Sequence, residues 1–185
     1  LNERQVNDLV DAIKDWLDPD SAVTGGGAEN AYYSSLPEPY VCKNGPLDSL
    51  EELLKVRGMT RELFYGVEGQ PGVSTCLTTE GSGRININTA PRQVLRALAP
   101  GITESAAEEM ELFRKKERDR LSDPLWYKKV AGMETVNIPS GILTVRSEVF
   151  SVTSTGVVGT LSRSINGMLE RDESGKIKIL SWKVR

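Results

Sequence analysis

The spacing of apolar and polar positions changes once along the chain, near residue 141. Before it, in the segments that have a period, apolar residues recur at intervals of three and four, which is typical of helices that pack by one face. After it the interval becomes two, which is typical of strands. The sequence therefore predicts an α+β protein in which a large helical part precedes an antiparallel sheet over residues 142–185.

The clearest predicted helix covers residues 2–17. Asn2 and Gln5 have the spacing of a capping box, in which each side chain accepts a hydrogen bond from the other residue's backbone N–H. Pro19 cannot continue the ladder of helical hydrogen bonds and is expected to end the helix. Six apolar residues form its predicted core face: Val6, Leu9, Val10, Ile13, Trp16 and Leu17.

Short helical segments follow, and two of them share a sequence. Val-Arg-Gly-Met at residues 56–59 matches Val-Ala-Gly-Met at 130–133, and a candidate helix cap, Asp48 or Ser122, precedes each run at the same distance. Thr60 and Thr103 are further predicted caps. The repeat predicts two related helical units, over residues 1–80 and 81–141.

Three antiparallel strands are predicted at the C-terminal end, over residues 143–155, 161–171 and 177–184. In the last strand the apolar phase shifts between Ile179 and Leu180. A shift of this kind indicates a β-bulge, because one extra residue moves the following side chains to the other face.

The amino-acid composition limits the possible functions. The chain has no histidine, and therefore lacks the commonest general base and the commonest transition-metal ligand. It has 23 basic and 26 acidic side chains, a net charge of −3, which gives no electrostatic reason to expect a nucleic-acid partner. A hydrolase built on Asp18 and Glu29 would have no recognisable pocket, so no enzymatic activity is expected.

The only two cysteines are Cys42 and Cys76. They are too far apart for a CxxC redox pair and too few for a structural zinc site. Both lie in loop-like sequence, which favours a disulfide between them. Two unrelated buried thiols are the alternative.

Residues 18–46 show no period, and a loop of this length in a compact domain is usually held by a metal, a disulfide or a functional contact. Asp18, Asp20 and Glu29 offer hard oxygen donors that suit calcium. They occupy positions 1, 3 and 12 of an EF-hand loop, but Ala22 and Val23 stand where that motif needs a ligand and a glycine. From these residues alone, either a calcium site or a solvated acidic turn is possible.

Longer motifs resemble a known family. The runs WLDPDS at 16–21, GAENAYY at 27–33 and NGPL at 44–47 resemble the signature of K-class minor pseudopilins of type II secretion systems, and ININTAP at 85–91 is similar to a second signature of that family. Together these matches cover about residues 8–140.

This resemblance implies a pilin-like fold with a large helical insert that is SAM-like or helix-hairpin-helix-like. It implies that calcium is bound in the insert by Asp18, Asp20, Glu29 and Asn30. The family pattern usually has an acidic residue at the last of these positions, where the Asn side-chain carbonyl can still bind calcium.

The resemblance also implies a structural role at the tip of the pseudopilus, where the protein would initiate or cap assembly. The implied partners are the I-class and J-class minor pseudopilins, in a 1:1:1 complex. No stretch here approaches the roughly 20 apolar residues of a membrane span. The family's N-terminal hydrophobic helix, which would anchor the full-length protein on the periplasmic side of the inner membrane, is therefore expected outside these residues.

An alternative comes from residues 88–90 and 100–103, which are similar to the helix-hairpin-helix pattern of DNA-binding proteins. Such hairpins offer backbone N–H groups and basic side chains to phosphate. Here the hairpin is followed by Glu104, Glu108 and Glu109, whose charge has the wrong sign. No nucleic-acid partner is expected.

Overall fold

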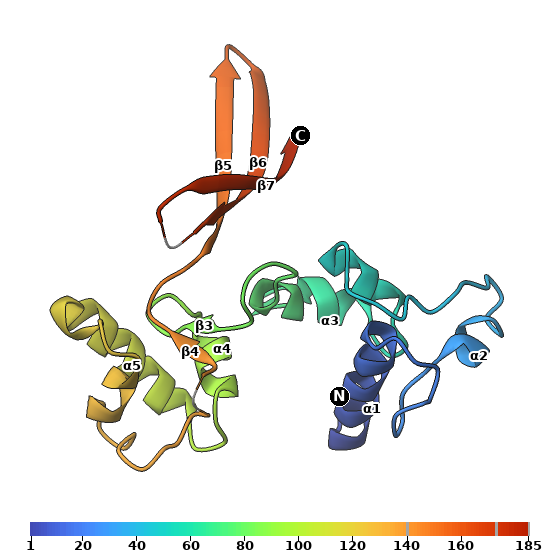
Figure 1. The fold of residues 1–185 in the computed structure, drawn as a ribbon, viewed down its shortest axis with the longest axis horizontal. Coiled ribbons are helices and arrows are strands. Elements are labelled where there is room, and N and C mark those ends of the chain that lie inside the picture. The colour runs from blue at the N-terminus through green and yellow to red at the C-terminus, as the bar shows by residue number, and fades with distance from the viewer. Residues whose placement is uncertain (140, 173, 185) are drawn as a thin grey trace. The chain divides into compact units, whose positions relative to one another are not determined.

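The computed structural model describes residues 1–139, 141–172 and 174–184. The chain divides into two compact units, Leu1–Thr79 and Glu80–Arg185 (Figure 1). The division lies one residue before the predicted boundary at 80/81. The other predicted boundary, after residue 141, does not separate compact units, since the second helical hairpin and the sheet fall in one unit.

The first unit is built from helices and short turns. Its elements are α1 (Glu3–Leu17), α2 (Asn30–Tyr33), the 3₁₀ helix η1 (Leu50–Lys55), α3 (Arg61–Tyr65), the antiparallel pair β1 (Gly66–Val67) and β2 (Gln70–Pro71), and the 3₁₀ helix η2 (Val73–Cys76).

The start of α1 confirms the predicted capping box. Asn2 Oδ1 accepts from Gln5 N, and Gln5 Oε1 accepts from Asn2 N, both at 2.9 Å. The predicted core face was too wide, because Val6, Val10 and Leu17 are 44%, 55% and 38% exposed. Ala12 and Asp15 are buried in their place, next to Trp16, because the loop after α1 packs on that side of the helix.

The caps of the two repeated helices lie one residue after the predicted positions. Ser49, in place of Asp48, forms a capping box with Glu52 at the start of η1. In the second unit Asp123, in place of Ser122, accepts from Leu125 N at 2.9 Å. Both helices are 3₁₀ rather than α.

The repeated runs 56–59 and 130–133 form the same turn. In each run the methionine N–H donates to the valine carbonyl, at 3.1 Å and 3.0 Å respectively. The glycine of each run has a left-handed φ, 86° and 80°, which a residue with a Cβ adopts only with strain. The internal repeat is therefore a repeated structure.

The second unit contains the other elements. They are β3 (Ile85–Asn86), α4 (Arg92–Ala97), α5 (Glu104–Lys116), η3 (Arg118–Arg120), η4 (Pro124–Lys129), β4 (Leu143–Thr144), β5 (Val149–Val158), β6 (Leu161–Arg171) and β7 (Ile177–Val184). Strand β3 pairs with β4 in parallel, an interaction that the sequence did not predict.

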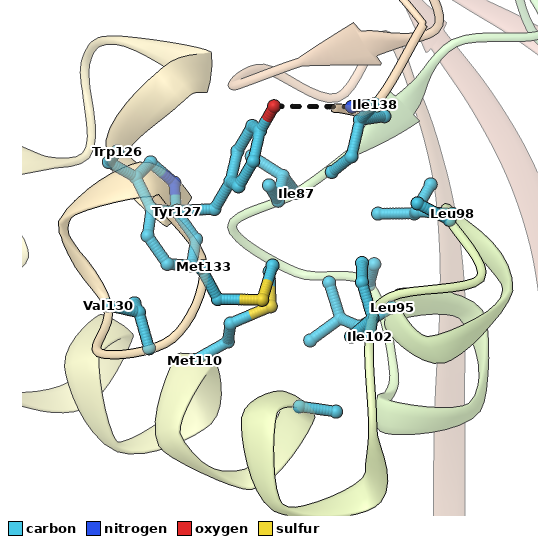
Figure 2. Close-up of a cluster of buried hydrophobic side chains, with 13 residues drawn as sticks. Ile87, Leu95, Leu98, Ile102, Met110, Trp126, Tyr127, Val130, Met133 and Ile138 are labelled. Carbon is cyan, nitrogen blue, oxygen red and sulfur yellow. Dashed lines mark hydrogen bonds between the residues drawn. The ribbon is translucent and has the colours of Figure 1, made fainter. Parts of the chain in front are cut away.

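Figure 2 shows the core of this unit, where side chains from α4, α5, η4 and the following loop meet. Trp126 is buried and stacks on Phe113, with ring centroids 5.4 Å apart and the planes at 3°. Its Nε1 donates to Asn88 Oδ1 at 2.8 Å. The hydroxyl of Tyr127 accepts from Ile138 N at 3.3 Å.

Strands β5, β6 and β7 form an antiparallel sheet in that order. Met168 pairs with Ser181 and Leu169 with Ile179, which leaves Leu180 as the extra residue and confirms the predicted bulge. The register places many exposed apolar side chains on one face of the sheet: Phe150, Val152, Val158, Leu161, Ile177, Ile179, Trp182 and Val184.

Candidate metal centre

Three carboxylates of the loop after α1 converge. Asp18, Asp20 and Glu29 each place one oxygen within 4.8 Å of the oxygens of the other two. Glu29 is only 3% exposed, Asp18 is half-buried and Asp20 is exposed. The structure thus brings together the three acidic residues that the sequence selected.

Several oxygens at this point are buried without a hydrogen-bond partner among the described residues: Asp18 Oδ1, Glu29 Oε1 and Asn44 Oδ1. A buried polar atom without a partner costs about 1–3 kcal/mol, and more when it is charged. A hard cation would offset that cost, and all of these donors are oxygens, as calcium prefers. The residues present therefore fit a calcium ion.

Asn44 also belongs to this cluster, although the sequence did not single it out as a candidate metal ligand. Its Nδ2 donates to Glu29 Oε2 at 3.4 Å and to the main-chain oxygen of Asp20. Its φ of 46° is left-handed, a conformation that Asn tolerates better than most residues. The signal was present, because Asn44 opens the NGPL run that carried part of the family resemblance.

Asn30, the fourth predicted ligand, has a hydrogen-bond partner for its side-chain oxygen. Its Oδ1 accepts from Cys42 N at 2.7 Å, and it lies at the start of α2. This hydrogen bond braces the loop, and the buried amide oxygen without a partner among the described residues is that of Asn44.

The triple glycine allows the loop to lie against the carboxylates of α1. Thr24 N donates to Asp15 Oδ1 and Gly26 N to Asp11 Oδ2, both at 3.0 Å. A Cβ at Gly26 or Gly27 would clash with a carboxylate of α1. Only glycines bring the backbone this close, and the contact fixes the chain just before Glu29.

Aromatic rings fill the space behind the loop. Trp16 packs edge-on against Tyr33, with centroids 5.2 Å apart, and Tyr40 lies 5.3 Å from Tyr33. Burial raises the pKa of Tyr33 to about 12, so its hydroxyl stays protonated at neutral pH. These rings give the loop a packed support that is independent of any ion.

Both cysteines are free thiols in the structure, contrary to the predicted disulfide. Cys42 is buried, and its Sγ donates to Asp15 O at 3.6 Å. Cys76 is half-buried at the end of η2, with Sγ 3.7 Å from Thr75 Oγ1. Each thiol thus has its own local contact.

This arrangement predicts unequal thiol reactivity. Burial raises the pKa of Cys42, which lowers its thiolate fraction, so Cys76 should react much faster with a disulfide reagent such as DTNB. Two thiols should be counted after unfolding in guanidinium without reductant. A count of zero there would mean that the cysteines are bridged.

The hairpin of the second unit does not suit a phosphate ligand, because acidic residues already neutralise its basic side chains. Arg92 pairs with Glu111 at 2.6 Å and with Glu104 at 3.4 Å, and Arg96 pairs with Glu104 at 2.8 Å. The hydrogen bond from Arg92 lowers the pKa of Glu111, which keeps this carboxylate ionised at neutral pH. DNA binding through this hairpin is therefore not favoured.

Comparison with known protein families gives a match in each of the two helical regions. The family described as Type II secretion system (T2SS), protein K, matches in two segments, residues 1–68 and 85–118. The chain belongs to the protein K family of type II secretion systems. The first segment contains the whole candidate metal centre, and the second begins at the ININTAP run.

Relatives in the protein K family share modest identity with the chain. Type II secretion system protein K of Aeromonas hydrophila is 28% identical over 181 residues, which cover 93% of this chain and 52% of that protein. The protein of the same name from Pectobacterium carotovorum subsp. carotovorum is 33% identical over 81 residues, 44% of this chain and 24% of that protein. The chain thus spans about half the length, or less, of these relatives.

A solved structure shows the same fold. A chain in the crystal structure of the GspK-GspI-GspJ complex from the enterotoxigenic Escherichia coli type 2 secretion system matches with a TM-score of 0.67 and 19% identity. The match covers 100% of this chain and 65% of that one. The mixture of helices and antiparallel sheets is therefore the fold of a solved protein.

Proposed function

We propose that this chain is part of a minor pseudopilin that acts in type II secretion, at the tip of the pseudopilus, to initiate or cap its assembly. The observation that carries the proposal is the match to protein K across both helical units. The role is structural, and no catalytic step is assigned to any residue.

Within this proposal the two parts of the chain have different tasks. Residues 142–185 are the pilin-like sheet that joins the pseudopilus, and the helices before them are the insert, SAM-like or helix-hairpin-helix-like in type. More than two thirds of the chain lies in that insert. Such bulk is difficult to repeat along a narrow fibre, which supports a single copy at the end.

The candidate metal centre is assigned to calcium, held by Asp18, Asp20, Glu29 and Asn44. The support is the set of buried oxygens without partners and the absence of nitrogen or sulfur donors from the acidic cluster in the described residues. Calcium would hold the long loop after α1 in one conformation. Its task is therefore stability of the insert, not chemistry.

The proposed partners are the I-class and J-class minor pseudopilins, in line with the GspK-GspI-GspJ complex named above. The proposed location is the periplasmic side of the inner membrane, to which the family suggests attachment. No helix among the described residues has the length and apolarity to span a bilayer.

Assembly provides the test of this function. The chain alone should be monomeric by light scattering coupled to size exclusion, and with the soluble I-class and J-class proteins it should elute as a 1:1:1 complex. Mixtures with each partner singly show whether both are needed. A homo-oligomeric filament, or no association at micromolar concentration, would reject the assignment to the tip.

A further inference from the structure

One arginine contacts the loop of residues 18–46, the metal loop, on both sides of Glu29. Arg57 Nη1 donates to Gly27 O at 2.9 Å and lies 3.4 Å from Gly26 O. On the other side of Glu29, the guanidinium carbon lies 5.2 Å from the centroid of the Tyr32 ring. The chain before and after this ligand is therefore held by one side chain.

The backbone of Arg57 adds a third connection, because its N–H donates to the Tyr33 hydroxyl at 3.3 Å. Tyr33 belongs to α2, which has only four residues and starts directly after Glu29. A helix this short is not stable by itself, because nucleation is costly. Its position, and with it the position of Glu29, therefore depends on neighbours such as Arg57.

The internal repeat shows that the turn itself does not need an arginine. Ala131 occupies the equivalent position in the run 130–133, which forms the same turn with the same hydrogen bond and glycine conformation. The two copies of the turn therefore differ in this side chain, which is Arg57 in one copy and Ala131 in the other. The copy that carries the arginine is the one beside the metal loop.

Only a guanidinium can make these contacts together. It is planar, has several N–H donors in a rigid fork, and stacks on aromatic rings while it donates in its own plane. A lysine ammonium in its place would keep the positive charge and lose the fork. Arg57 is not a ligand, since it has no acceptor atom.

From these contacts we infer that Arg57 is a positioning residue for the metal centre, which holds Glu29 in place before the cation arrives. The inference rests on the proposed calcium site. Residues that orient metal ligands typically change metal affinity by about 10–100-fold when they are replaced.

The experiment compares three variants by calorimetric calcium titration: Arg57→Ala, Arg57→Lys and Arg61→Ala. Both Arg57 variants should bind calcium about 10–100-fold more weakly than the parent protein. Arg61→Ala is the matched control, because Arg61 also lies 5.2 Å from a tyrosine ring, that of Tyr65 in α3. It should bind like the parent.

A second measurement separates positioning from a general loss of structure. Terbium can replace calcium, and its luminescence lifetimes in H₂O and D₂O report how many water molecules are bound to the ion. In the Arg57 variants we expect more bound water, because Glu29 no longer reaches the ion reliably. A purely structural role would weaken the fold in chelator and leave this hydration unchanged.

The outcomes distinguish the two proposals. If the parent binds no calcium, the calcium assignment fails and the inference about Arg57 fails with it. If the parent binds calcium and Arg57→Lys matches it in affinity and hydration, only the inference fails. If Arg57→Ala does not fold, the lysine variant decides.

Discussion

The Glu29→Gln variant is expected to lack the stabilisation that the proposed calcium ion would give to the first unit. Binding to the native state alone adds RT ln(1 + [L]/Kd), about 2.7 kcal/mol when free calcium is 100 times Kd. Glu29 is the most buried of the converging carboxylates, and its Oε1 has no partner among the described residues. Its loss should therefore remove most of the calcium effect.

The measurement is denaturant unfolding of parent and variant, each in calcium and in chelator. In chelator the variant should be at least as stable as the parent, because it no longer buries an unpaired charge. Glu38→Gln changes an exposed carboxylate of the same loop and should respond to calcium like the parent. A Glu29→Gln protein with the full calcium response would show that Glu29 is not a ligand.

Replacing Trp126 with alanine is expected to destabilise the second unit by about 3–5 kcal/mol, the usual cost of removing a large buried aromatic side chain. Trp126 is fully buried and stacks on Phe113. The change also leaves Asn88 Oδ1 without its donor, while Asn88 Nδ2 still donates to Leu121 O at 3.0 Å. A partly buried acceptor that loses its donor adds to the cost of the cavity.

Urea unfolding followed by near-ultraviolet circular dichroism checks this value. Leu125→Ala is the control, since Leu125 precedes Trp126 in η4 and is 51% exposed, and it should change stability by less than about 1 kcal/mol. Calcium affinity should be the same in both variants, because Trp126 lies outside the first unit. A loss of calcium binding in Trp126→Ala would contradict this independence.

Features that depend on neighbouring residues were predicted well from the sequence. The capping box of α1, the Thr60 and Thr103 caps and the bulge at Leu180 all formed as expected. Each depends on hydrogen bonds or side-chain alternation within a few residues. The convergence of Asp18, Asp20 and Glu29 was predicted for a similar reason, since these three residues lie close together along the chain.

Two helix caps were predicted one residue too early, because neighbouring residues can both act as caps. Asp48 and Ser49 can both cap a helix, and periodicity does not distinguish them. The backbone decides for Ser49, because its carbonyl accepts the first hydrogen bond of η1 from Glu52 N at 3.2 Å, whereas Glu52 Oε1 accepts from the backbone N–H groups of both Asp48 and Ser49. The same shift by one residue occurs at Asp123.

Contacts between distant segments were decided only by the tertiary structure. The loop with the triple glycine determines which side of α1 is covered, so Val6 and Val10 are exposed although their spacing is that of core residues. Asn44, from the far end of the loop, contacts Glu29, and the backbone N–H of Cys42 donates to the Asn30 oxygen. Spacing along the chain selects which residues can act together, but the partner of each polar atom is set by where the folded backbone brings its donors and acceptors.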